Sequence, residues 1–170
     1  MLFRSQDIKI AARTHEAGKG AVVVINKWDL IEKDESTLED YKKKVKARLT
    51  FMDYVPIIAV SALTKQRITK LFDIIEQIID ERKRRIPTAR LNTVLRNIVA
   101  RHSPQRYRGK EVKIYYFTQV AIEPPTFIVF TNYPKGIKEQ YLRYVEKGLR
   151  NAFGFEGTPI RIFIRGKKNP

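Results

Sequence analysis

Short apolar segments alternate with amphipathic ones along the first half of the chain. Segments 21–25 and 55–60 are continuous and rich in β-branched residues, which is typical of short strands buried on both faces. Around them, apolar residues recur at helical spacing over 36–49 and 68–79, and the candidate cap Ser5 with Gly18 and Gly20 predicts a helix over 5–17. The order helix, strand, helix, strand, helix predicts βα units around a parallel sheet. Two strands are too few for a covered α/β domain, so we interpret this half as the end of a larger one.

The ends and the buried faces of these helices can also be predicted. Ser5 is a candidate N-cap for the first helix, and Ser36 with Glu39 forms a capping-box pattern for the second. The third helix is expected to turn one apolar stripe toward the core. That stripe consists of Ile68, Leu71, Phe72, Ile75, Ile78 and Ile79.

A basic segment ending at Pro87 interrupts this pattern, and the order of elements changes after it. The second half is expected to contain a helix from Thr88, strands over 112–120 and 126–132, a helix over 138–153 and a strand from Ile160. This α-β-β-α-β order predicts a small α+β domain with one antiparallel sheet. The sequence therefore predicts an α/β part over 1–86 and an α+β domain over 87–170.

The positive charge is concentrated in the second of these parts. The 170-residue chain carries 34 Lys and Arg against 18 Asp and Glu, a formal net charge of +16. Residues 87–170 hold 16 of the basic and 5 of the acidic side chains, a net of +11, which leaves +5 for residues 1–86. A strongly basic folded domain is typical of proteins that bind a polyanion.

Composition narrows the class of protein further. With 43% hydrophobic residues the chain can form a core, and without cysteine it can form neither a disulfide nor a thiolate metal site. The longest apolar runs are far too short to cross a bilayer, and the N-terminal residues lack a signal-peptide core. We expect a cytoplasmic protein with no membrane partner.

The most informative motif is Asn26-Lys27-Trp28-Asp29, which follows the strand predicted over 21–25. The carboxyl ends of parallel strands are where α/β folds hold their ligands. A carboxylate such as that of Asp29 can accept two hydrogen bonds from the N1–H and 2-amino groups of guanine, a donor pair that adenine lacks. The stem of Lys27 can lie over the base, and the amide of Asn26 can tie the loop to its neighbours.

Ser61-Ala62-Leu63 follows the second predicted strand in the same way. There the backbone N–H of Ala62 is expected to be free to donate to the O6 carbonyl of guanine, and its small side chain leaves that approach open. Either motif alone can occur by chance. Together, each between a buried strand and a helix, they predict a guanine site.

The stretch from Gly18 to Phe72, with these two motifs, resembles the end of the second GTPase domain of the Der (EngA) GTPases. The resemblance continues through FTNYPKGIKEQYLRYVEKGLRNAFGFEGTPIRI. It implies the end of a P-loop GTPase-type parallel sheet followed by a KH-like domain, in a GTP-binding factor that assists assembly of the large ribosomal subunit. By this resemblance, guanine contacts fall on Asn26, Lys27, Asp29, Ser61, Ala62 and Leu63.

The chain lacks other parts of that family's pattern. No G-x-x-x-x-G-K-[ST] phosphate loop and no Asp-x-x-Gly switch occur in it, and phosphoryl transfer depends on positioning the phosphates. We therefore expect GTP or GDP as ligand, Mg²⁺ only in a complete protein, and no hydrolysis by this chain alone. The poor match of Met1–Ser5 suggests an incomplete gene model that lacks the preceding GTPase domains of the same polypeptide. We identify no catalytic residue and no metal ligands.

Two features of the basic domain bear on RNA binding. Gly154-Phe155-Glu156-Gly157 matches the GXXG loop that KH domains use to clamp RNA, but no second helix follows it, and a helix C-cap with a turn is the favoured interpretation. Basic side chains are the stronger signal, although charge runs are usually solvated surface. The candidates are Arg101, Arg106, Arg108, Lys110, Arg161, Arg165, Lys167 and Lys168.

Aromatic residues on the predicted strands could stack on bases, but sheet core is their commoner role. They are Tyr115, Tyr116, Phe117, Phe127 and Phe130. The main alternative to a GTPase part is a free-standing basic module that binds ribosomal RNA and keeps a vestigial nucleotide site.

Overall fold

A computed structural model describes residues 4–32 and 36–167 and divides the chain into two compact units. The first unit is the chain up to Arg82 together with Phe155–Pro159. The second is Lys83–Gly154 together with the chain from Ile160 onward. The division therefore falls after Arg82, where we had placed it after residue 86, and a five-residue segment of the second half is built into the first unit.

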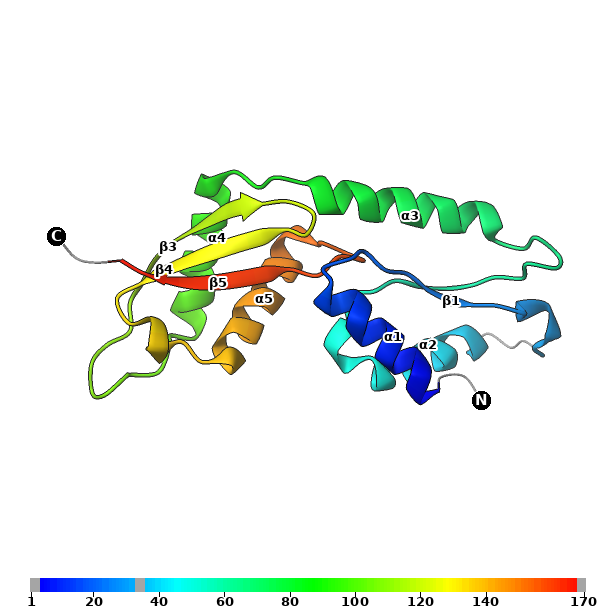
Figure 1. The fold of residues 1–170 in the computed structure, drawn as a ribbon, viewed down its shortest axis with the longest axis horizontal. Coiled ribbons are helices and arrows are strands. Elements are labelled where there is room, and N and C mark those ends of the chain that lie inside the picture. Colours follow the sequence, from blue (N-terminus) through cyan, green and yellow to red (C-terminus); the bar gives the residue numbers. More distant parts are fainter. Residues whose placement is uncertain (1–3, 33–35, 168–170) are drawn as a thin grey trace. The chain divides into compact units, whose positions relative to one another are not determined.

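The first unit contains the predicted alternation of helices and strands. Its elements are α1 (Ser5–Glu16), β1 (Val23–Ile25), α2 (Thr37–Arg48), β2 (Ile57–Ala59) and α3 (Ile68–Lys83), which Figure 1 shows in blue to green. Strands β1 and β2 pair in parallel, with Val23 opposite Ile57 and Ile25 opposite Ala59. This pairing confirms the parallel arrangement predicted from the βα order.

The helix starts differ in part from the prediction. Ser36 occupies the N-cap position of α2 as expected, but its side chain forms no capping hydrogen bond there, so the predicted capping box with Glu39 is not formed. Arg4 and not Ser5 is the N-cap of α1. The carboxylate of Asp7 accepts a hydrogen bond of 2.8 Å from the Arg4 backbone N–H. An acidic side chain in the first turn therefore satisfies an amide group that the helix itself cannot bond.

The core of the first unit lies between β1 and the helix α2 with the turn after it. Trp28, Val45, Leu49, Met52 and Val55 are each at most 4% exposed. The other side of the sheet and most of α3 are less covered than predicted. Val24 is 40% exposed, although we expected burial on both faces of this strand, and the predicted core residues Phe72, Ile75 and Ile79 of α3 are 60%, 37% and 42% exposed. Among the described residues this sheet has two strands, so one face of it and much of α3 lack a covering layer.

The second unit contains the predicted α-β-β-α-β order. Its elements are α4 (Thr88–Arg101), β3 (Ile114–Ala121), β4 (Thr126–Thr131), α5 (Glu139–Phe153) and β5 (Arg161–Gly166). The sheet order is β3-β4-β5, with β3 antiparallel and β5 parallel to the central β4. The expectation of an all-antiparallel sheet is therefore wrong. Between β4 and β5 the chain runs back through α5, and a helical crossover of this kind returns the next strand in the same direction.

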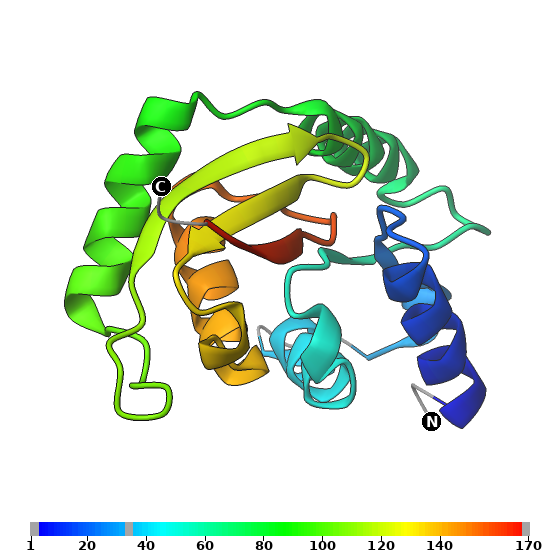
Figure 2. The same ribbon diagram turned by 60° about the vertical axis from the view of Figure 1, so that its left-hand side comes forward.

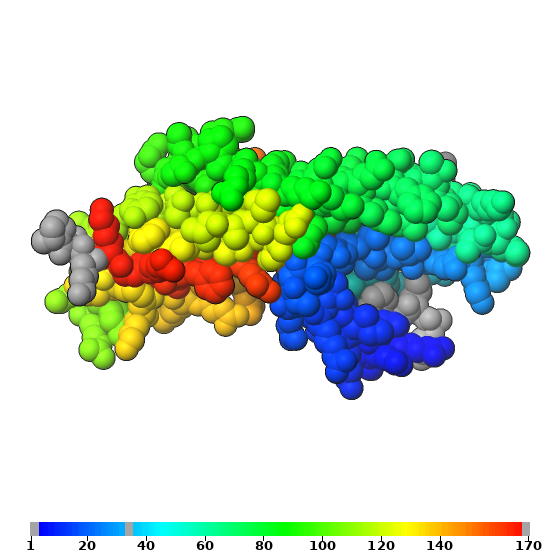
Figure 3. Space-filling model, turned by 45° about the horizontal axis from the view of Figure 1, so that its top comes forward, coloured from blue at the N-terminus to red at the C-terminus, as the bar shows by residue number. Residues whose placement is uncertain are grey.

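Both helices of the second unit cover one face of its sheet, as Figures 1 and 2 show together. Leu91 of α4, Phe117 and Phe127 of the sheet and Leu149 of α5 are fully buried between the layers. The two phenylalanines are thus core residues, and our favoured interpretation is correct for them. Strands β3 to β5 reach the surface on the opposite face, in yellow to red in Figure 3, where Phe163 is 55% exposed.

Candidate functional site

The parallel pairing of β1 and β2 brings the two predicted guanine loops together. Beyond the last paired residues, the N–H of Val60 donates to the carbonyl of Ile25 at 2.8 Å. The N–H of Trp28 then donates to the carbonyl of Val60 at 3.0 Å. These bonds carry the strand pairing into the loops, so both motifs lie at the carboxyl edge of the sheet.

The side chain of Asn26 joins the two loops. Its Oδ1 accepts one hydrogen bond from the N–H of Lys27 at 2.7 Å and another from the N–H of Ala62 at 3.1 Å. Lys27 adopts a left-handed backbone with a φ of 61°, which turns the loop sharply at this point. The bond from Ala62 differs from our expectation, because the amide that we assigned to guanine O6 already has an acceptor in this structure.

Ser61 holds the carboxylate that we expect to bind the base. Its Oγ donates to Oδ1 of Asp29 at 2.5 Å and accepts from the N–H of Thr64 at 3.1 Å. Ser61 is fully buried, whereas Asp29 is partly exposed. An ionised carboxylate has about four acceptor sites on two oxygens, so the bond from Ser61 does not by itself exhaust its capacity to accept hydrogen bonds. The sequence placed Ser61 in the site without this role.

Trp28 is buried and anchors the loop to the core of the first unit. The sequence did not predict this role, because Trp28 occupies the variable position of the Asn-Lys-x-Asp motif. It is 3% exposed, and its ring meets that of Tyr41 edge-on at 5.4 Å. The neighbouring Asn26 and Lys27 are exposed, as are Ala62 and Leu63, the last of them at 84%. The loops therefore combine a buried apolar anchor with an open polar edge, which suits recognition of a planar base by its hydrogen-bonding edge.

The Gly154–Gly157 segment is not an open loop. Phe155 is fully buried, and its N–H donates to Oε2 of Glu81 at 2.7 Å. The N–H of Gly157 donates to the carbonyl of Tyr54, and its carbonyl accepts from the N–H of Ala21, both at 2.8 Å. Gly154 is the C-cap of α5, as the favoured interpretation had it. From Phe155 to Gly157 the segment belongs to the first unit, where it supports the chain just before β1.

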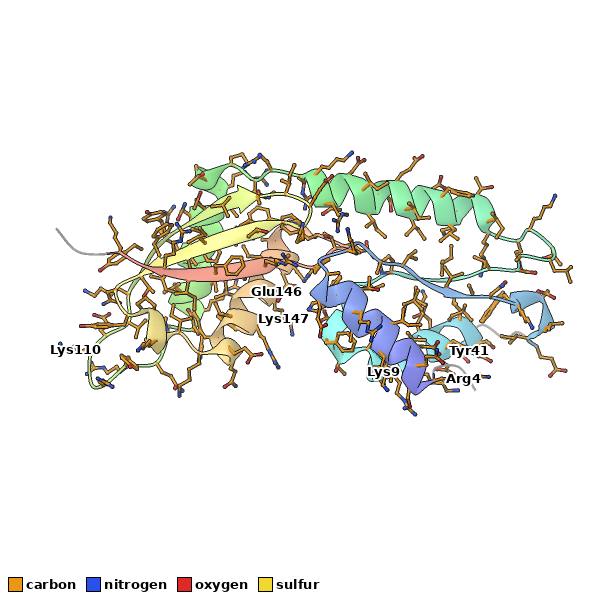
Figure 4. The ribbon with its side chains drawn as sticks, in the orientation of Figure 1. Arg4, Lys9, Tyr41, Lys110, Glu146 and Lys147 are labelled. Carbon is orange, nitrogen blue, oxygen red and sulfur yellow. The ribbon has the colours of Figure 1, made fainter. Side chains whose placement is uncertain are left out.

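Most of the candidate RNA-binding residues gather at one end of the second unit's sheet. Strand β3 begins where β4 and β5 end, so the loop before β3 and the residues after β5 share that end. Arg101 ends α4, and Arg106, Arg108 and Lys110 follow on this loop, where Figure 4 labels Lys110. All four are exposed, and Arg108 lies over the ring of Tyr107 at 5.5 Å.

The strand residues among those candidates divide between the two ends of β5. Arg165 and Lys167 lie at the basic end, with Lys167 over the rings of Tyr115 and Tyr116 at 5.6 and 5.7 Å. Arg161 begins β5 and so lies at the opposite end. Lys168 falls outside the described residues. We define the basic end by its six exposed residues, Arg101, Arg106, Arg108, Lys110, Arg165 and Lys167.

Over 4–32 and 36–167, no three His, Cys, Asp or Glu side chains are grouped so that they could hold a metal ion. In the same part of the chain, no helix combines the length and the apolar character needed to span a membrane.

The chain resembles known proteins over 96% of its length. Residues 85–165 match the family model described as the KH-domain-like domain of EngA bacterial GTPase enzymes, C-terminal. The GTPase Der of Moorella thermoacetica is 49% identical over 96% of this chain, and that of Geobacillus sp. is 47% identical over 96%. The GTPase Der of Rippkaea orientalis is 48% identical over 96%. The chain spans 36–37% of the length of these relatives. Over that part of its relatives' length, the chain belongs to the GTPase Der (EngA) family.

Proposed function

We propose that this chain is the guanine-recognition end and the C-terminal domain of a GTP-binding factor that assists assembly of the large ribosomal subunit in the cytoplasm. The observation that carries the proposal is the network at the carboxyl edge of β1 and β2. In it, Asn26 joins the two loops and Ser61 positions the Asp29 carboxylate. Such a site fits the base of GTP, because the exposed edge of the site supplies hydrogen-bonding groups and the aliphatic stem of Lys27.

The residues of this chain do not fit the rest of the nucleotide's chemistry. The sequence holds no phosphate loop, and the described residues offer no cluster that would hold Mg²⁺. We assign no step of hydrolysis to them. In a complete protein, the triphosphate and its Mg²⁺ would be held by phosphate-loop and switch segments that this sequence does not contain.

The purified chain is therefore expected to hydrolyse GTP no faster than buffer in the presence of Mg²⁺. Positioning and neutralising the phosphates supplies nearly all of the catalysis in this reaction class, and base contacts contribute binding alone. Release of inorganic phosphate measures this, with a full-length GTPase Der as the positive control. Turnover that scales with the concentration of the chain would contradict it.

A second function, binding of ribosomal RNA by the second unit, rests on the basic end. Of its six exposed cations, Arg108, Lys110 and Lys167 lie over tyrosine rings, and the sequence from residue 87 on carries a net charge of +11. This function does not need a working nucleotide site, so it also covers the alternative of a free-standing RNA-binding module.

Binding of a single-stranded RNA is expected to weaken steeply with salt. If four cations of the basic end contact phosphates, the slope of log affinity against log salt concentration is about −3, because each contact contributes about −0.7. The double substitution of Arg106 and Arg108 by Gln is expected to bring the slope to about −1.4. Arg96→Gln is the matched control, because Arg96 is exposed on α4 but lies outside the basic end. A flat salt response would contradict phosphate binding.

A further inference from the structure

A pocket of about 680 Å³ opens beside the basic end of the second unit. Its walls come from the end of α4, from the loop after it, from the short helical turn Pro134–Gly136 and from the first turns of α5. The residues that matter for its chemistry are Arg101, His102, Gln105, Lys138, Tyr141 and Tyr144. Of the site residues predicted from the sequence, Arg101 alone lines this pocket. We call it the α4–α5 pocket.

One wall of the pocket is aromatic and held in place by hydrogen bonds. The ring of His102 lies nearly parallel to that of Tyr141 at 6.3 Å and meets Tyr144 edge-on at 5.5 Å. The Tyr141 hydroxyl donates to the carbonyl of His102 at 2.9 Å, and the Tyr144 hydroxyl donates to the carbonyl of Ile98 at 3.0 Å. Burial, with a smaller effect of Tyr144, raises the pKa of Tyr141 to about 12. Its hydroxyl therefore stays protonated and keeps donating at any pH near neutrality.

His102 is the solvent-exposed part of this aromatic wall. Tyr141 is 9% exposed and forms the floor, whereas His102 is exposed and continues the aromatic surface outward. Because the three rings are already in contact and two are tethered, a flat ligand can stack on them without first ordering them.

The remaining lining is cationic and amidic. Arg101 and Lys138 are exposed at the rim, and Nζ of Lys138 lies 3.4 Å from Oε1 of Gln105. Among the described residues, none that lines the pocket carries a carboxylate, and the nearest in sequence, Glu139, is paired with Arg143 at 2.6 Å. These groups suit a nucleotide. Its base can stack on the flat aromatic wall, its phosphate can bind the two cations, and the polar edge of the base can bond to the carboxamide.

We propose that the α4–α5 pocket binds one unpaired nucleotide, with its base on His102 and Tyr144 and its phosphate between Arg101 and Lys138. The inference rests on the RNA binding proposed above. A base of double-stranded RNA is stacked on its neighbours and is not available to side chains, so the nucleotide belongs to a single-stranded segment. RNA is favoured over a free nucleotide because Arg106, Arg108 and Lys110 extend the positive charge beyond the pocket, where a longer strand has further phosphates.

The test measures binding of the 170-residue chain to a single-stranded oligoribonucleotide, to the same strand in a duplex and to a free nucleoside monophosphate. His102→Ala is expected to weaken oligoribonucleotide binding about tenfold with an unchanged salt slope, since stacking is not a charge effect. His102→Phe is expected to restore the affinity. Lys138→Gln is expected to lower the salt slope by about 0.7. Arg96→Gln, outside the pocket, is expected to change neither value.

The possible outcomes separate this inference from the function on which it rests. If the wild-type chain binds no RNA at low salt, the proposed RNA binding is wrong, and the pocket assignment falls with it. If the wild-type chain binds RNA and both pocket variants behave like Arg96→Gln, RNA binding holds and the pocket assignment is overturned. Equal affinity for the monophosphate and the oligoribonucleotide would overturn the assignment to RNA.

Discussion

Replacement of Asp29 by Asn is expected to reverse the base preference of the chain from guanine to xanthine. The Asp29 carboxylate can accept from both N1–H and the 2-amino group, whereas an Asn amide places a donor against one of them. Loss of a hydrogen bond to a charged group costs about 1.5–3 kcal/mol. Guanine binding should therefore weaken by about ten- to 150-fold. Xanthine has a carbonyl where guanine has the amino group, and the Asn amide can donate to it.

The measurement compares the dissociation constants of guanosine and xanthosine monophosphates at millimolar concentration. Asp53→Asn is the matched control, because Asp53 is exposed and lies outside both loops. Ser61→Ala should give an intermediate result, because it removes the bond that positions Asp29 but keeps the carboxylate. We expect about fivefold weaker guanine binding there, equivalent to about 1 kcal/mol, with guanine still preferred. An unchanged base preference in Asp29→Asn would remove Asp29 from the site.

Gly157→Ala is expected to lower the free energy of unfolding of the first unit by about 2–5 kcal/mol. Gly157 has a φ of +71°, and a Cβ there would lie 2.3 Å from Cγ1 of Ile78 and 3.3 Å from the carbonyl oxygen of Ala21. The substitution therefore adds backbone strain to a clash inside a packed core. Urea unfolding followed by the fluorescence of Trp28 measures it, since this is the one tryptophan of the chain and is buried in the first unit.

Two further variants separate the clash from the strain. Ile78→Ala removes the atoms that the new methyl group meets, so in that background Gly157→Ala should cost only about 1–2 kcal/mol. Gly109→Ala has strain alone, because Gly109 has a φ of +75° and an added Cβ would have no neighbour within 4 Å. Its cost, followed by circular dichroism, should also be about 1–2 kcal/mol. Equal costs of Gly157→Ala with and without Ile78 would contradict the clash.

The sequence predicted the elements well because their signals are local. β-Branched runs marked β1 and β2, and helical spacing or end signals located the five α-helices of the described residues. The pairing of β4 with β5 was predicted wrongly, since the direction of a strand depends on the path of the intervening α5 and not on the strand's own residues. Phe72 and Ile79 were predicted as core residues but are exposed, for a related reason. An apolar stripe indicates the packing to which a helix is suited, and the layer that would cover it is not among the described elements.

The candidate site was predicted less completely than the fold. The motif residues and their meeting at one sheet edge follow from the strand order. The bond from Ser61 to Asp29 and the use of the Ala62 amide by Asn26 join residues 32 and 36 positions apart, and no local pattern encodes them. The burial of Phe155 in the first unit was also not predicted, because the sequence Gly-Phe-Glu-Gly is compatible with an open loop and with a buried segment.

The most direct test of the central claim, that the two loops form one guanine-reading site, follows the backbone amides of Lys27 and Ala62 by nuclear magnetic resonance. Guanosine and adenosine monophosphates are titrated separately into the wild-type chain at the same millimolar concentrations. We predict that guanosine monophosphate shifts both amide resonances, because guanine O6 competes with Asn26 for the Ala62 N–H, and that adenosine monophosphate leaves them in place. Equal shifts with both nucleotides, or no shift of either amide with guanosine monophosphate, would contradict the claim.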